Sequence, residues 1–536
     1  MNMKVKYIKS FMTVALLVLA ASCTDLDVDI KSQYTEFPDS ETAAEAKAAN
    51  AYFAMRGPLG RDYNHAQTLS SDETMSYSFN GSDYYDNGRY NHMALHNWTP
   101  DDATIGYWEN FTQGITTCNG LIAEMGGDEA AVTAPIRAVR AYYLWVLMDS
   151  YGDVPLLNRI LAEDEAIDRS PRAEIAQFIE SELLAVIDLL STNVDISTYG
   201  KPTRWMADAL LAKLYLNWAV YTCGDVATYT PTMANSKLND VVKFCDDIIA
   251  SGKFDLTDSY MSKFNSENGS HIKDFIYAMP FDRETQQGMT YARFWTHRNG
   301  NKEFYGVDLP SSVGGCFAVN SEFADKFNLA GDDRNEQIIG GPLYIRSAST
   351  YKATTTPWMV DGKQVTLTKN ITLNKLDETM PVDNTAHGGR SQGYRSIKFY
   401  MDLKTTASQS RNQSNDVPIF RFADVLLMKA EAILRGATAT NGDSPMSLMN
   451  QIRDYVHAPK VTSNPTLDEL LDERAREFAD ENWRRNDLIR FGKFENDWGY
   501  KHIINPSAKT ELYRRIFPVP KYILNTNTNW SQNKGY

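Results

Sequence analysis

Apolar positions along much of the chain recur with the spacing of an α-helix. After Ser170, the expected N-cap, and Pro171, the expected first helical residue, apolar side chains fall every three or four positions. This stripe consists of Ile175, Phe178, Ile179, Leu183, Val186, Ile187 and Leu190. Further helices are predicted over 137–157, stopped by Gly152 and Pro155, and over 203–224 and 241–252. Two successive helix pairs at this spacing are typical of tetratricopeptide-type hairpins, although the connectors are irregular.

Residues 253–415 have a different composition, with more Gly, Asn, Thr and Ser and with short strand candidates at 274–281 and 364–373. Helical periodicity returns over 420–436 and 466–494, where Thr466 and Glu469 have the spacing of a capping box. We therefore predict a mainly α fold. Its helical-hairpin scaffold, at about 41–252 and 416–536, is interrupted by an irregular region of loops and short strands at about 253–415.

The N-terminus has the three parts of an export signal. Lys4, Lys6 and Lys9 precede an apolar run over 11–21 that is too short to span a bilayer comfortably, and small residues lead to Cys23. Cleavage after residue 22 would make Cys23 the first residue of the mature chain, as in a bacterial lipoprotein, where several acyl chains together give a stable anchor. The alternative is an ordinary secretory signal with a cysteine nearby.

Acidic residues follow the cysteine, and residues 23–40 are interpreted as an acylated cysteine with an acidic tether. Asp25, Asp27, Asp29 and Glu36 also occupy positions 1, 3, 5 and 12 of an EF-hand loop. Ile30 stands at the sixth position, where the sharp turn of such a loop requires glycine, so calcium binding is not favoured.

Composition narrows the classes of ligand. The 536 residues carry a formal net charge of −14, and removing residues 1–22 removes three lysines and no acids. Such an acidic surface disfavours nucleic acid and leaves neutral ligands open. Besides Cys23 there are Cys118, Cys223, Cys245 and Cys316, without a CxxC pair, and they are expected to be buried free thiols. A bridge between Cys223 and Cys245 is conceivable in an oxidising compartment.

Five segments in order resemble the SusD/RagB family: residues 137–157, 200–219, 420–436, 473–494 and the tail 515–536. In the tail, Lys534 replaces the proline usual in this family. The resemblance covers nearly the whole mature chain. It implies a lipid-anchored protein on the outer face of the outer membrane, with residues 41–536 forming a SusD-like domain. This domain would capture an oligosaccharide or polysaccharide and sit over a SusC-like TonB-dependent transporter, without catalysis or cofactor.

A glycan site requires aromatic platforms beside amide, carboxylate or guanidinium groups, because sugars present CH-rich faces and rims of hydroxyls. Two loop-like stretches, 72–98 and 291–310, have this composition, and loops are where binding residues concentrate. The expected ligand-binding residues are Asp72, Tyr84, Tyr85, Arg89, Tyr90, Trp98, Tyr291, Trp295 and Tyr305. Trp98 and Trp295 are the preferred platforms. The competing interpretation is that these aromatic side chains only pack the loops onto the scaffold.

Other chemistries have weaker support. His92 and His96 lie four residues apart, but no HExxH glutamate accompanies them, so a metal site is not favoured. The alternating charges of 473–478 and 483–488 are interpreted as ion-paired scaffold. A glycoside hydrolase requires two carboxylates across the scissile bond, and a chain with 68 acidic residues does not exclude such a pair. Peptide capture, implied by the RagB branch of the resemblance, is the main alternative to glycan binding.

Overall fold

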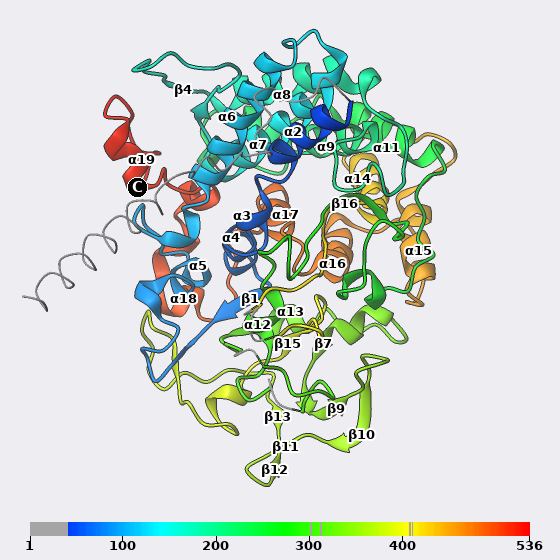
Figure 1. Cartoon of the computed structure of the whole chain (residues 1–536). Helices are drawn as coiled ribbons and strands as arrows, with labels where there is room; N and C mark the ends of the chain where they lie inside the picture. The colour runs from blue at the N-terminus through cyan, green and yellow to red at the C-terminus, as the bar shows by residue number, and fades with distance from the viewer. Residues whose placement is uncertain (1–40, 301–302, 311–312, 407–408, 410) are drawn as a thin grey trace, which may run out of the picture. The chain divides into compact units, whose positions relative to one another are not determined.

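Helices packed side by side build the scaffold (Figure 1). The computed structural model describes residues 41–536 apart from 301–302, 311–312, 407–408 and 410, and residues 47–536 form one compact unit. The predicted signal peptide, Cys23 and the acidic tether lie outside the described residues. In the first part of the chain α6 packs on α7 and α7 on α8, while α9 packs on α11. Their bounds are α6 Trp108–Glu124, α7 Ala134–Tyr151, α8 Arg172–Val186, α9 Arg204–Leu216 and α11 Leu238–Ala250.

The C-terminal helices continue this arrangement, although 171 residues, 251–421, separate α14 from α11 in the sequence. Helix α14 packs on α11 and α15 on α14 (Figure 1). The bounds here are α14 Phe422–Leu434, α15 Pro445–Tyr455, α16 Leu467–Phe478 and α17 Arg484–Arg490. The predicted mainly α scaffold is confirmed.

Local sequence signals set several helix ends. The predicted capping box of α16 is present. The backbone N–H of Glu469 donates to the Thr466 hydroxyl, and the backbone N–H of Thr466 donates to the Glu469 carboxylate. Gly152, with φ +78°, ends α7 as expected. Helix α8 differs slightly from the prediction, because Pro171 is its N-cap and Ser170 belongs to the short strand β4 (Arg169–Ser170).

The strands described are short and pair in twos. β1 (Thr74–Ser76) pairs antiparallel with β6 (Phe317–Val319), and β2 (Ser78–Phe79) pairs parallel with β14 (Pro381–Val382). The predicted strand at 274–281 is β5 (Phe275–Met279), which pairs antiparallel with β16 (Val417–Arg421). The candidate at 364–373 contains only β13 (Thr366–Leu367) and the end of β12 (Lys363–Gln364). These pairings attach the middle region to both halves of the scaffold.

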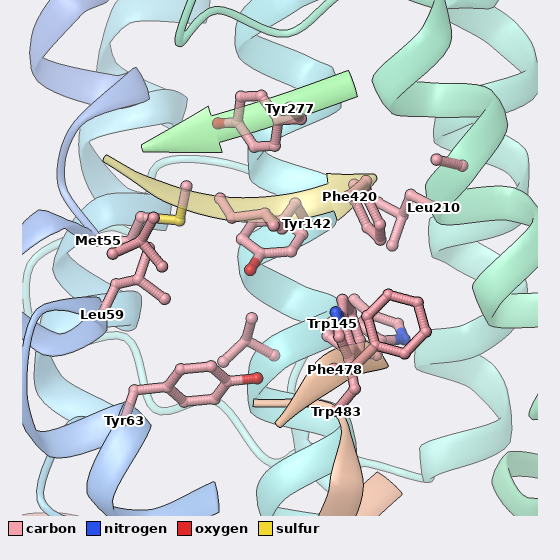
Figure 2. Packing of buried hydrophobic residues seen from close by; sticks show 14 of the residues in the cluster. Met55, Leu59, Tyr63, Tyr142, Trp145, Leu210, Tyr277, Phe420, Phe478 and Trp483 are labelled. Atoms are coloured by element: carbon pink, nitrogen blue, oxygen red, sulfur yellow. The ribbon is translucent and has the colours of Figure 1, made fainter. Parts of the chain in front are cut away.

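The main core lies where the scaffold helices meet β5 and β16. Figure 2 shows Tyr142, Trp145, Tyr277, Phe420 and Trp483 converging there, and all are at most 5% exposed. A second, smaller apolar cluster lies within the middle region and contains Phe304, Tyr305, Leu309, Trp358, Val365 and Tyr400. Among the residues described, no helix is both long enough and apolar enough to cross a bilayer.

The charged residues around 473–490 are ion-paired scaffold, as predicted, and they are buried. Glu473 pairs with Arg334 at 2.7 Å, Arg474 with Asp487 at 2.7 Å, and Arg490 with Glu431 at 2.7 Å. The first pair joins α16 to the middle region, and the other two join α16 to α17 and α17 to α14. Removing one partner would leave a buried charge uncompensated, which typically costs about 3–5 kcal/mol. Cys118, Cys245 and Cys316 are buried free thiols, as predicted, whereas Cys223 is a free thiol that is only half-buried.

Candidate ligand-binding surface

The loop that follows β2 has an unusual backbone. Asn80, Tyr84, Asp86 and Asn87 all have positive φ, and Tyr84 reaches φ +66°. Asparagine and aspartate tolerate the left-handed region, whereas for tyrosine it costs about 1–2 kcal/mol. Strained residues of this kind persist only where the surrounding structure holds them, and they are concentrated at functional sites.

Three neighbours hold the Tyr84 ring, which is half-buried. Phe79 packs edge-on against it at 6.4 Å, and the guanidinium of Arg298 lies 5.5 Å from its centroid. Arg293 donates a hydrogen bond of 3.3 Å to its hydroxyl. The ring also lies close to the backbone of Gly314, where an added Cβ would come within 2.6 Å of the tyrosine oxygen. The position of this aromatic side chain is therefore fixed before any ligand arrives.

The neighbouring Tyr85 is also half-buried, and its hydroxyl donates a hydrogen bond of 3.1 Å to Glu378. Burial, followed by this hydrogen bond, raises the pKa of Tyr85. Arg89 ends the loop and pairs with Asp62 at 2.6 Å, which ties the loop to α4 (Asp62–Leu69). Tyr84 and Tyr85 are the two tyrosines of the predicted set whose side chains reach the surface.

Guanidinium and amide groups from two other segments lie beside the tyrosines. Arg298 pairs with Asp83 at 2.5 Å. Arg390 donates to Asn384 at 2.8 Å and to Asn299 at 3.0 Å. Burial, and then the charge of Arg298, lowers the pKa of Arg390, which nevertheless stays protonated at neutral pH. Aromatic rings and fixed polar groups are thus combined on one surface, which we call the Tyr84 surface: Asp83, Tyr84, Tyr85, Arg293, Arg298, Asn299, Asn384 and Arg390.

The structure corrects the choice of Trp98 as a platform. Trp98 is 1% exposed and packs edge-on against Phe517 at 5.2 Å, and its indole N–H donates a hydrogen bond of 2.8 Å to the hydroxyl of Tyr536. Arg514 further covers it, donating to its backbone carbonyl. With its ring faces covered, Trp98 belongs to the core.

The other preferred platform, Trp295, is also buried at 6% exposure and packs edge-on against Phe317. Tyr90, Tyr291 and Tyr305 are at most 2% exposed, and each hydroxyl is hydrogen-bonded inside the protein. Tyr291, for example, donates to the Leu59 carbonyl at 2.6 Å. In these four positions the competing interpretation holds: the aromatic side chains pack the loops onto the scaffold.

Asp72 does not join the Tyr84 surface in the structure. Its carboxylate forms two hydrogen bonds of 2.7 Å with Arg484 of α17, and it lines a different depression together with Trp498.

His92 and His96 do not act as a pair in the structure. His92 hydrogen-bonds Asp102 at 2.7 Å, while His96 is buried and hydrogen-bonds the Ser70 carbonyl at 2.9 Å.

Sequence reasoning missed Arg390 and Asn384. They lie in the loop after β14, at least 300 residues from Tyr84, and reach the same surface because β14 pairs with β2, which precedes the loop of Tyr84. No local signal in 383–390 identifies these side chains as ligand-facing.

Comparison with known proteins decides the family. One family model, described as the SusD family, matches residues 273–536, and another, described as starch-binding and associating with the outer membrane, matches residues 25–216. The chain belongs to the SusD family. It is similar to the starch-binding protein SusD of Bacteroides thetaiotaomicron, with 23% identity and all of both chains covered.

Solved structures of the SusD superfamily share the fold. A member from Parabacteroides distasonis aligns with a TM-score of 0.68 and 19% identity, covering 92% of this chain and 99% of that one. Surface glycan-binding protein A from Bacteroides fluxus aligns with a TM-score of 0.67 and 18% identity, covering 93% and 100%. At these identities the likeness supports the fold alone.

Proposed function

We propose that this SusD-family chain is a cell-surface lipoprotein that binds an oligosaccharide or polysaccharide at the Tyr84 surface and delivers it to a TonB-dependent outer-membrane transporter. The observation that carries the proposal is the half-buried Tyr84, held in a left-handed backbone beside Arg293 and Arg298. The names of the starch-binding and surface glycan-binding proteins to which the chain is similar support glycan as the class of ligand.

The chemistry of the Tyr84 surface suits a sugar. A pyranose ring can place its CH-rich face on an aromatic ring while its hydroxyls accept hydrogen bonds from guanidinium N–H groups. Arg298, Arg390 and Asn299 are already held by protein partners, so their remaining donors are oriented before the ligand binds. Such preorganisation lowers the entropic cost of binding.

Binding is proposed to occur without bond cleavage. A glycosidase places one carboxylic acid and one carboxylate on opposite sides of the scissile bond. At the Tyr84 surface, Asp83 is ion-paired with Arg298, and Glu378 accepts the hydroxyl of Tyr85. Neither acidic side chain is positioned as the free member of such a pair, which supports capture over hydrolysis.

The ligand class is tested with the chain from Thr24 onward on an array of defined glycans, including starch-derived α-glucans and laminarin, and on a peptide library. We expect glycan binding that weakens in Tyr84→Ala and persists in Tyr344→Ala, which removes a tyrosine that is 38% exposed on β9 (Tyr344–Arg346). Peptide binding alone would replace the proposal with RagB-like peptide import. Shorter saccharides after long incubation would instead indicate a hydrolase.

The proposed partner, an outer-membrane transporter, is inferred from the expected lipid anchor on Cys23. Several acyl chains on Cys23 would hold the protein at the membrane, and captured glycan requires a route inward. A stable lid over a transporter requires an interface above about 1,000 Å². We expect an affinity pull-down in mild detergent to recover the chain with a large SusC-like barrel. Recovery of the chain alone, with and without glycan, would leave a free-standing surface binder.

A further inference from the structure

A pocket that is distinct from the Tyr84 surface opens in the middle region. It has a volume of about 190 Å³ and lies between η6 (Met261–Phe264) and the loop that joins β9 to β10 (Ala353–Pro357). Its lining consists of Ser259, Tyr260, Met261, Ser262, Asn265, Asp333, Glu336, Arg346, Thr350, Tyr351, Lys352, Ile397 and Tyr400. No residue of the Tyr84 surface contributes to this lining.

The smaller apolar cluster connects the two places. Tyr400, which lines the pocket, packs edge-on against Tyr305 at 5.3 Å. The hydroxyl of Tyr305 in turn hydrogen-bonds that of Thr296 at 2.5 Å, two residues before Arg298 of the Tyr84 surface. The pocket and the Tyr84 surface are therefore linked through this cluster, but they share no residue.

Tyr351 repeats at this pocket the backbone strain of Tyr84. Its φ is +59°, and its ring is half-buried. Arg346 holds the strained residue by donating two hydrogen bonds, of 3.0 and 2.6 Å, to its carbonyl oxygen. The ring leans on Tyr400, with centroids 5.1 Å apart and planes at 51°. A tyrosine is seldom found in this conformation, and here it presents a fixed aromatic side chain to a concave space.

Polar groups face the same pocket without a net charge. Asp333 and Glu336 balance Arg346 and Lys352, so a neutral ligand fits better than an ion. Lys352 and Glu336 are 3.6 Å apart with side chains 71% and 52% exposed, so their attraction is weak and both can turn to a ligand. On the opposite wall, the hydroxyl of Ser262 donates to the Ser259 carbonyl at 2.7 Å and retains its lone pairs as acceptors.

We propose that this pocket is a second saccharide site, which takes one neutral sugar unit with its CH-rich face on Tyr351 and its hydroxyls toward Ser262, Asn265 and Lys352. The class of ligand rests on the proposed glycan-binding function, whereas the location rests on the pocket itself. A pocket of this size suits one sugar ring with weak affinity on its own, and a chain bound at two sites gains avidity.

The test measures saturation-transfer NMR with five separate monosaccharides: D-glucose, D-galactose, D-mannose, D-xylose and N-acetyl-D-glucosamine. We expect at least one sugar to bind the wild-type chain and the Tyr84→Ala variant alike. Tyr351→Ala and Ser262→Phe, which fills the pocket and keeps the tyrosine, should each weaken that binding about tenfold. Tyr344→Ala, on the strand that enters the same loop, is the matched control and should bind as wild type. Crystals soaked in the same sugar should show it against Tyr351.

The outcomes separate this inference from the proposed function. Binding that is lost in Tyr84→Ala and retained in both Tyr351→Ala and Ser262→Phe would overturn the second site and support the first. If a sugar binds at Tyr351 and the glycan array shows no effect of Tyr84→Ala, the second site is supported and the Tyr84 surface is overturned. Absence of every one of the five sugars from the pocket, in solution and in soaked crystals, would overturn the second site outright.

Discussion

Variants at Tyr84 can separate the contribution of its ring to ligand affinity from the contribution of its strained backbone to stability. Tyr84→Phe keeps the ring and removes the hydroxyl that accepts from Arg293. Tyr84→Ala and Tyr84→Asn both remove the ring, but asparagine tolerates φ +66° better than alanine does. Gly314→Ala keeps the tyrosine and displaces it, because the new Cβ would come within 2.6 Å of the hydroxyl oxygen and 2.8 Å of the ring carbon Cζ.

The expected changes in Kd and in the free energy of unfolding follow from these contacts. Stacking on one aromatic side chain contributes about 1–3 kcal/mol in the analogous case of nucleic-acid bases, so losing the ring should raise Kd by about 5- to 150-fold. The hydrogen bond from Arg293 is long at 3.3 Å, so Tyr84→Phe should change Kd by less than about fivefold. Because alanine has a larger penalty at positive φ, Tyr84→Ala should be less stable than Tyr84→Asn by about 0.5–1 kcal/mol.

Isothermal titration calorimetry with a glycan identified on the array gives Kd for the four variants, and urea denaturation gives their free energies of unfolding. We expect Tyr84→Ala and Tyr84→Asn to lose similar affinity, Gly314→Ala to lose several-fold, and Tyr84→Phe to stay near wild type. Unchanged Kd in Tyr84→Ala, with binding intact, would refute the Tyr84 surface as the site. Equal stability of the Ala and Asn variants would refute the argument from strain.

Cys23→Ala should release the protein from the membrane fraction, because Cys23 is the expected acylation site; equal incorporation of labelled palmitate into both proteins would contradict this. Trp98→Ala should lower the free energy of unfolding in urea by about 3–5 kcal/mol, since the ring is buried, and a change below about 1 kcal/mol would contradict its core placement. Burial raises the pKa of Asp208 to about 7, and neither of its carboxylate oxygens is hydrogen-bonded. The folded state therefore retains a proton that the unfolded chain releases above about pH 4, so this group lowers stability as the pH rises toward 7. Urea denaturation should accordingly show that Asp208→Asn changes the free energy of unfolding more favourably at pH 8 than at pH 5, by about 1–3 kcal/mol. A difference between variant and wild type that does not depend on pH would exclude the effect.

The helical scaffold could be predicted because its signals are local. Apolar stripes with helical spacing, the capping box of Thr466 and Glu469, and the stop at Gly152 act within one or two turns. The predicted ion pairing of 473–478 and 483–488 also proved structural, because Arg474 pairs with Asp487. The strand at 275–279 was visible as an apolar run, but its partner, β16, was not.

The binding surface depended on tertiary structure, because loop aromatics have no periodicity that fixes which side faces water. Trp98 is buried because Tyr536, 438 residues away, meets its indole N–H. Tyr84 reaches the surface because the loop turns through positive φ, and Arg390 reaches the same surface because β14 pairs with β2. The helices were thus predictable because they depend on interactions between near neighbours, and the family was recognisable because its motifs are continuous runs of residues. Only the folded chain decided which rings are exposed, because burial is set by contacts between segments hundreds of residues apart.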